Sequence, residues 1–304
     1  MRVCSLLPGA TEIAFALGLG DNVVGVTHEC DYPPAARQKP VVVRSAIDSD
    51  GMTSLEIDRW VSERLRRNQG LYVIDAARLH EAAPDVILTQ GLCDVCAIDY
   101  DDVVSAAQAL SPQPKIVTLT PHCLTDILTD VTRVGQATER PDPAEGLVRD
   151  LERRISAVRE RTAQSSSRPR VACIEWLDPI YAAGHWVPEM VRLAGGHDGL
   201  GREGEPSAKI AWAKFLEFDP EVVALMPCGF DIKRTLREAA LLERLDGWRS
   251  LPAFKAGRVY AVNGHAFFSR PGPRLIDGLE ILSAIIHPET FPVRIAPEMA
   301  QRIV

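Results

Sequence analysis

The chain has 304 residues and a net charge of −7, and 46% of its residues are hydrophobic and 25% charged. This composition is typical of a globular protein with one large or two ordinary domains, and the acidic balance argues against a nucleic-acid partner. No stretch approaches the roughly 18 continuous apolar residues of a membrane-spanning helix, so we expect no membrane insertion.

The N-terminal residues and the number of cysteines predict the cellular location of the protein. Residues 3–7 already have the pattern of a core strand, which leaves no room for a secretion signal in the sequence as given. Seven cysteines, an odd number, fit a reducing compartment better than a disulfide framework. We therefore expect a cytoplasmic protein, or a periplasmic or cell-surface one if the true start lies upstream.

Strands and helices should alternate in the first half. Short β-branched runs predict buried parallel strands, and Thr11 and Asp99 have the position of helix caps, with Gly18 at a left-handed helix end. The predicted strands are residues 3–7, 23–26, 71–74, 86–88 and 115–119. The predicted helices are residues 13–17, 55–65, 75–82, 99–110 and 124–137.

One long helix should follow. Asp142 has the position of its cap and Pro143 that of its first turn, and apolar residues recur at helical spacing from Leu147 to Val158. The pattern ends at the serine-rich stretch that begins with Ser165. Such a helix would be roughly 33 Å long, which suits a connection between two lobes.

The alternation then resumes. The predicted strands are residues 171–174, 221–226 and 259–262, and the predicted helices are residues 187–194, 231–245 and 272–286. This pattern predicts an α/β fold of two Rossmann-like lobes, residues 1–140 and 166–304, joined by one long backbone helix at residues 141–165. A ligand would bind in the cleft between the lobes.

Two loops carry metal-binding residue types. His28 and Cys30 follow one predicted strand, Cys93 and Cys96 follow another, and strand carboxyl ends are where open α/β sheets bind ligands. These four residues could hold zinc or iron, with Glu29 as an acid or base. The alternative is that the cysteines are small buried hydrophobic residues, because a second CxxC pair is missing.

Aromatic residues gather in the second half, at Trp176, Trp186, Trp212, Phe267 and Phe268. Each could pack in a core, but as a group they would suit a large flat apolar ligand. His185 and His265 are further candidates for the cleft. No nucleotide-binding glycine motif is present, and the lack of GxSxG leaves an acyl-transfer hydrolase unsupported. The two-lobe pattern, the loop aromatics and Trp212 lead us to expect a binding protein and not an enzyme.

Several stretches resemble a known family, namely SLLPGATEI (5–13), VGVTHECDYP (24–33), PDVI (84–87) and WRSLPAFKAGRVY (248–260). The chain resembles the cobalamin-binding and siderophore-binding proteins of ABC importers, and the vitamin B12-binding subgroup above all. The resemblance covers nearly the whole chain. It implies non-catalytic binding of a cobalamin-type corrinoid between two lobes, by a monomer with an ABC permease as a candidate partner.

The resemblance also implies site residues. Trp212 falls where the family has a tryptophan stacked on the corrin, whereas Glu29 and Gln90 stand where it has aromatic residues. Glu217 would be the carboxylate that docks on the permease, but its first-lobe counterpart is Ala77. Together with the loop residues noted above, these positions give the expected ligand-binding set His28, Glu29, Gln90, Trp176, Trp186, Trp212, Phe267 and Phe268.

Two alternatives stay open beside the corrinoid. The first is a zinc- or iron-dependent or redox protein that uses His28, Cys30, Cys93 and Cys96. The second is a ferric-siderophore binder, whose cationic cleft residues would be Arg44, Lys209 and Arg270.

Overall fold

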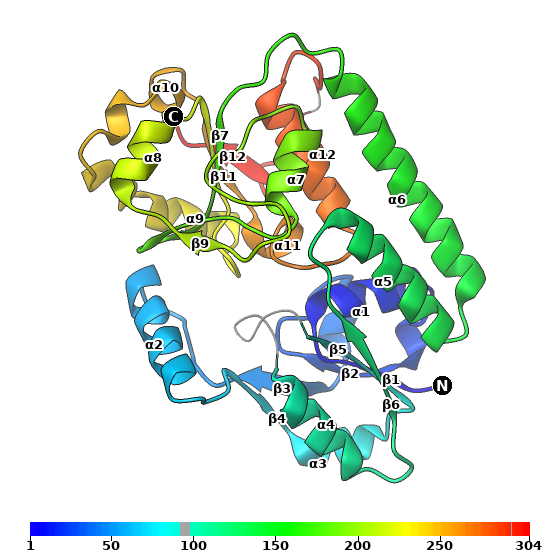
Figure 1. The fold of residues 1–304 in the computed structure, drawn as a ribbon. Coiled ribbons are helices and arrows are strands. Elements are labelled where there is room, and N and C mark those ends of the chain that lie inside the picture. The colour runs from blue at the N-terminus through cyan, green and yellow to red at the C-terminus, as the bar shows by residue number, and fades with distance from the viewer. Residues whose placement is uncertain (92–97, 293) are drawn as a thin grey trace.

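A computed structural model describes residues 1–91, 98–292 and 294–304 and has two α/β lobes joined by a long helix (Figure 1). Each lobe is built on a six-stranded sheet, with the order β4-β3-β2-β1-β5-β6 in the N-terminal lobe and β12-β11-β10-β7-β8-β9 in the C-terminal lobe. The predicted fold class is confirmed.

The N-terminal sheet is parallel apart from its edge strand β4, which pairs antiparallel with β3. Its strands are β1 Val3–Ser5, β2 Val23–Thr27, β3 Val41–Ser45, β4 Tyr72–Ile74, β5 Val86–Gln90 and β6 Lys115–Leu119. Its helices are α1 Pro8–Ala16, α2 Ser54–Arg66, α3 Ala76–Ala82, α4 Tyr100–Gln108 and α5 Leu124–Ala137. Buried side chains of α1 and α5 cover one face, and those of α3 and α4 cover the other.

In the C-terminal lobe β7, β10 and β11 are parallel, and β8, β9 and β12 are antiparallel to their neighbours. The strands are β7 Val171–Leu177, β8 Ile180–Ala182, β9 Ala208–Lys209, β10 Val222–Leu225, β11 Val259–Val262 and β12 Ala300–Arg302. The helices are α7 Val187–Leu193, α8 Trp212–Phe218, α9 Ile232–Ala239, α10 Pro252–Lys255, α11 Gly264–Phe267 and α12 Leu275–Ile286. Short 3-10 helices lie at Gly20–Asn22, Pro34–Gln38, Leu242–Arg244 and Trp248–Ser250.

Helix α6, Pro141–Thr162, connects the lobes along one side of the molecule (Figure 1). It packs on α5 of the N-terminal lobe and on α7 and α12 of the C-terminal lobe. Its side chains Leu151 and Val158 are buried in the C-terminal core, which gives the helix an apolar face along its length.

Several local predictions were wrong. Thr11 lies buried inside α1, where its hydroxyl donates to Ser5, and Leu7 occupies the cap position. Helix α6 begins at Pro141, so Asp142 lies in its first turn and Arg140 precedes it. The helix predicted over residues 231–245 ends at Ala239. Strands β8, β9 and β12 were missed because they have only two or three residues, too few to show a pattern. Strand β3 was also missed, although it has five residues and lies inside the sheet between β4 and β2, because residues 35–70 were interpreted as a surface segment.

Candidate functional site

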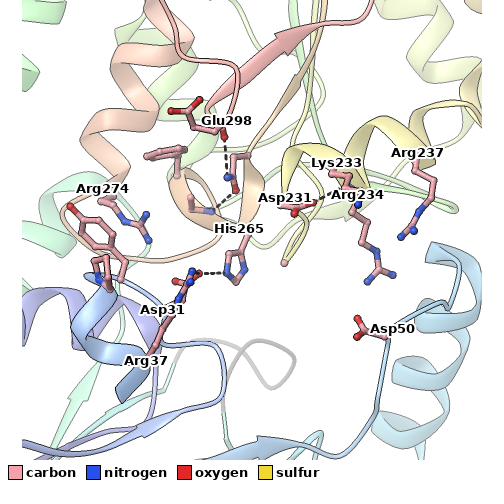
Figure 2. A pocket seen from close by; sticks show the side chains of 16 residues that line it. Asp31, Arg37, Asp50, Asp231, Lys233, Arg234, Arg237, His265, Arg274 and Glu298 are labelled. Atoms are coloured by element: carbon pink, nitrogen blue, oxygen red, sulfur yellow. Dashed lines mark hydrogen bonds and ion pairs between the residues drawn. The ribbon is translucent and has the colours of Figure 1, made fainter. Parts of the chain in front are cut away.

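A cavity of about 760 Å³ lies between the two lobes (Figure 2). The N-terminal lobe contributes Asp31, Tyr32, Pro34, Arg37 and Asp50 to its wall. The C-terminal lobe contributes Gly229, Asp231, Lys233, Arg234, Arg237, Asn263, His265, Ala266, Phe267, Arg274 and Glu298.

Strand ends supply most of this lining. Asp31 follows β2 and Asp50 follows β3, while Asp231 follows β10 and His265 follows β11. Loops after neighbouring parallel strands emerge at the same edge of a sheet, where ligands bind in open α/β folds. The two sheets therefore present their ligand-binding edges to a shared space, as the two-lobe prediction requires.

A buried arginine joins the lobes on one side of the cavity. Arg270 Nη1 lies 2.5 Å from Asp31 Oδ1, and Arg270 Nη2 donates to the carbonyl oxygen of Glu29 over 2.7 Å. His265 contacts Arg270 and places Nε2 3.3 Å from Asp31 Oδ2. Burial alone would raise the pKa of Asp31, but hydrogen bonds from His265 and the charge of Arg270 hold that pKa well below its usual range.

A second buried carboxylate completes this junction. Glu12 of α1 accepts a hydrogen bond of 2.6 Å from Arg274 Nη2, and Arg270 Nη1 is 3.6 Å away. Burial raises the pKa of Glu12 and outweighs the lowering by the two arginines. The guanidinium of Arg274 also lies 4.0 Å from the ring centroid of Tyr32, a cation–π contact at the cavity wall.

Helix α2 joins the lobes on another side. The Trp176 indole donates to the carbonyl oxygen of Ser54 over 3.1 Å, and the Ser54 hydroxyl donates to Glu238 over 2.9 Å. Tyr181 donates its hydroxyl to Asp58 over 3.1 Å. Because these donors and acceptors come from opposite lobes, α2 is bound to the C-terminal lobe by its first turns.

The predicted aromatic set is not assembled in the cavity. Phe267 lines it, but Trp186 and Phe268 are buried in the C-terminal core, where the Trp186 indole donates to the Phe268 carbonyl over 2.8 Å. Trp212 stacks on Phe215, with ring centroids 4.9 Å apart, and its indole donates to the Asp246 carbonyl. Trp176 contacts Phe230 as well as α2, so it supports the junction of the lobes.

The first-lobe candidates also lie outside the cavity wall. His28 pairs loosely with Glu29, Nε2 to Oε1 3.9 Å, and its ring is 6.3 Å from that of Tyr72. Gln90 is buried at the end of β5. Glu29 takes part only through its backbone carbonyl, which binds Arg270.

The zinc or iron hypothesis is not supported. Cys30 is buried, and its sulfur lies 3.0 Å from the Thr11 hydroxyl and 3.3 Å from the Thr27 hydroxyl. Burial raises the pKa of the Cys30 thiol, which disfavours the thiolate that a metal requires. Across the described residues, no three His, Cys, Asp or Glu side chains form a group able to hold a metal ion. Cys93 and Cys96 lie outside the described residues.

Of the three cations considered for a siderophore, Arg270 is committed to Asp31, Lys209 lies 4.0 Å from Asp58, and Arg44 is exposed on β3. Other cations line the cavity and were not among the predicted site residues, namely Arg37, Lys233, Arg234, Arg237 and Arg274. For Lys233 and Arg234 the sequence offers one signal, their place directly after Asp231, which caps α9 in the segment that follows β10.

The family described as periplasmic binding protein matches residues 3–265 of the chain. The chain belongs to this family. None of the helices described in the structure combines the length and apolar character needed to cross a membrane.

Curated relatives of this periplasmic binding protein cover nearly its full length. It is 25% identical over 295 residues to the ABC transporter substrate-binding lipoprotein YvrC of Bacillus subtilis, covering 95% of this chain and 81% of the relative. It is 23% identical over 290 residues to the vitamin B12-binding protein of Vibrio cholerae, covering 92% of this chain and 86% of the relative.

Solved structures share the fold. The periplasmic heme-binding protein RhuT of Roseiflexus sp. RS-1 has a TM-score of 0.71 at 20% identity, with 95% of this chain and 98% of that chain covered. The periplasmic vitamin B12-binding protein BtuF of Vibrio cholerae has a TM-score of 0.68 at 22% identity, with 94% and 96% covered. These likenesses support the two-lobe architecture of the family.

Proposed function

We propose that this protein binds a cobalamin-type corrinoid in the cavity between its lobes and delivers it to an ABC permease. The observation that carries the proposal is the cavity of about 760 Å³ whose wall is shared by both lobes at the ligand-binding edges of their sheets. Volumes of this size hold small-molecule ligands. The names of the vitamin B12-binding relatives supply the class of ligand.

Tyr32 is the side chain best placed to meet a flat ligand. It lines the cavity, 45% of its surface is exposed, and Arg274 lies over one face of its ring. A ring that contacts a guanidinium and keeps nearly half of its residue surface exposed can pack against the edge or face of a macrocycle. Phe267 adds a second aromatic contact in the same wall.

Heme, or another acidic iron chelate such as a ferric siderophore, is the second candidate ligand. The observation that favours it is the set of cationic side chains in the cavity wall. Heme-binding proteins are also among the solved structures that share the fold.

The names of the relatives, one of them a lipoprotein, favour a periplasmic or cell-surface location over the cytoplasmic one. Glu217 is exposed on α8 and does not line the cavity. It remains our candidate for contact with the permease, as the resemblance implies.

The binding test uses hydroxocobalamin and hemin separately, each mixed with micromolar protein and followed through gel filtration by its own absorbance. We expect hydroxocobalamin to co-elute, and Tyr32→Ala to weaken its binding at least tenfold. Tyr100→Ala is the matched control, because Tyr100 is 44% exposed and lies on α4 outside the cavity. If only hemin co-elutes with the protein, heme replaces the corrinoid as the proposed ligand. If neither compound co-elutes, both proposed ligands are refuted.

A further inference from the structure

One helix brings three cations to the cavity. Lys233, Arg234 and Arg237 of α9 all line it. Figure 2 shows Arg234 and Arg237 extending from α9 toward the side of the cavity where Asp50 lies. In the described parts of the chain none of the three forms an ion pair within 4.0 Å. Arg234 Nε is buried without a hydrogen-bond partner there, although Nη2 donates to the Met52 carbonyl.

The carboxylates next to these cations serve other groups. Asp231 caps α9 and accepts a hydrogen bond of 2.8 Å from the backbone nitrogen of Arg234. Glu238 turns toward α2 and accepts the hydroxyl hydrogen bond from Ser54. Asp50 and Arg234 point toward one another across the cavity (Figure 2), but no ion pair within 4.0 Å joins them. These carboxylates and the Phe230 ring, 4.0 Å from the Arg234 guanidinium, act on Arg234, but within the described chain no carboxylate forms an ion pair with a cation of α9.

The other side of the cavity is different. Arg270 pairs with Asp31 at 2.5 Å and Arg274 with Glu12 at 2.6 Å, and Arg37 lies 3.5 Å from Asp31. Cations that are already paired gain little from a ligand, whereas Lys233, Arg234 and Arg237, which have no ion-pair partner in the described chain, gain charge-assisted hydrogen bonds from an acidic group. Acidic groups of a ligand would therefore bind to the side chains of α9 in preference to Arg270 and Arg274 on the other side of the cavity.

We infer that Lys233, Arg234 and Arg237 bind acidic groups of the ligand, and that the preferred corrinoid carries free carboxylates on its periphery where cobalamin carries amides. The inference rests on the proposed function, because it specifies which class of corrinoid the cavity accepts. A guanidinium donates two parallel hydrogen bonds to a carboxylate, whereas an amide offers one uncharged acceptor and carries donors that an arginine cannot match.

The test compares three cobalt corrinoids that share a macrocycle and differ at the periphery. They are dicyanocobyrinic acid with carboxylates, dicyanocobinamide with amides, and the heptamethyl ester of dicyanocobyrinic acid. Quenching of tryptophan fluorescence gives each affinity in low and in high salt. We expect the acid to bind at least tenfold more tightly than the amide or the ester, and to lose most of this advantage in high salt.

Two variants assign the preference to α9. Lys233→Gln and Arg237→Gln should each weaken binding of dicyanocobyrinic acid about tenfold and change binding of dicyanocobinamide less than twofold. Lys214→Gln is the control, because Lys214 is also exposed but lies on α8 outside the cavity. Circular dichroism of each variant verifies the fold.

Equal affinities for acid and amide in the wild-type protein would overturn the inference and leave the proposed function standing. The inference also falls if the acid is preferred but both α9 variants bind it as the wild type does. Failure of all three corrinoids to bind would overturn the proposed function and the inference together.

Discussion

Glu12 of the N-terminal lobe and Arg274 of the C-terminal lobe form an ion pair of 2.6 Å across the junction of the lobes. Only 2% of the Glu12 side chain and 13% of the Arg274 side chain are exposed. Arg270 lies 3.6 Å from the same carboxylate oxygen and also forms an ion pair with Asp31. The lobes are thus fixed to one another by buried charges beside the cavity, and the cavity wall depends on them.

Replacing Arg274 by methionine should destabilise the protein more strongly as pH rises. Burial raises the pKa of Glu12, so this group contributes most to stability at low pH, where it is protonated, and less as pH rises. Loss of Arg274 removes a charge that favours ionised Glu12, and an unpaired buried partner costs about 3–5 kcal/mol. Urea unfolding at pH 5 and pH 8 should show the larger loss at pH 8.

The control for this prediction is Arg149→Met. Arg149 pairs with Glu145 on α6, but 65% and 69% of these side chains are exposed. Exposed pairs contribute at most about 1 kcal/mol, so the control should lose little at either pH. An equal loss by Arg274→Met at both pH values would show that Glu12 keeps one protonation state over this range.

The raised pKa of Asp130 on α5 predicts a second contribution to the pH dependence of stability. Burial raises its pKa to about 7 despite Arg133, whose Nη1 is 2.9 Å from Oδ1, and Oδ2 has no partner among the described residues. The unfolded value is about 3.9, so the folded protein binds the extra proton, and stability falls as pH rises from about 4 to about 7. Asp130→Asn, which stays neutral, should therefore be more stable than the wild type at pH 8 by about 2–4 kcal/mol.

The two proteins should converge near pH 4, where wild-type Asp130 is protonated. Asp150→Asn is the control, because Asp150 pairs with Arg153 on the exposed side of α6. Thermal unfolding from pH 4 to pH 8 gives both curves. Parallel curves for Asp130→Asn and the wild type would contradict the raised pKa of Asp130.

Gly9 should tolerate no side chain. A Cβ at this position would stand 2.2 Å from the carbonyl oxygen of Pro271, and Gly272 also approaches the Gly9 backbone from the other lobe. Backbone atoms cannot yield as a flexible side chain can, so Gly9→Ala should lose about 3 kcal/mol or shift the lobes apart. Urea unfolding and small-angle X-ray scattering measure the two outcomes.

Gly146→Ala is the matched control in a helix. Nothing lies within 4 Å of a Cβ at Gly146, so alanine should stabilise α6 by about 0.5–1 kcal/mol. If Gly9→Ala behaved like this control, the close approach of the lobes at Pro271 would be disproved.

Local patterns predicted the elements, because β-branched runs and helical spacing record burial within one segment. They failed where a residue's role depends on distant partners. Trp212 looked available for a ligand, but Phe215 and Trp248 pack against its ring within the C-terminal lobe. Thr11 looked like a cap, but the chain turns into α1 earlier and buries it.

The cavity cations illustrate the same limit. Lys233 and Arg237 belong to a short amphipathic helix whose polar face usually meets solvent. This face meets the N-terminal lobe because α6 places the edges of the two sheets opposite each other. The sequence around residue 233 holds no information about that arrangement. The stretch that holds Asp31 was noticed for its cysteine and histidine, although its carboxylate is the group that binds across the lobes.

Tyr181→Phe should loosen the contact between α2 and the C-terminal lobe. The Tyr181 hydroxyl donates to Asp58 over 3.1 Å, and a hydrogen bond to a charged acceptor contributes about 1.5–3 kcal/mol. Because only a few bonds tie α2 across the cavity, losing one should favour opening, and a bound corrinoid should dissociate about tenfold faster. Stopped-flow displacement measures that rate. Tyr260→Phe is the control, since the Tyr260 hydroxyl makes no hydrogen bond within the described chain and Tyr260 lies on β11. An unchanged dissociation rate in Tyr181→Phe would show that α2 does not hold the lobes closed over the ligand.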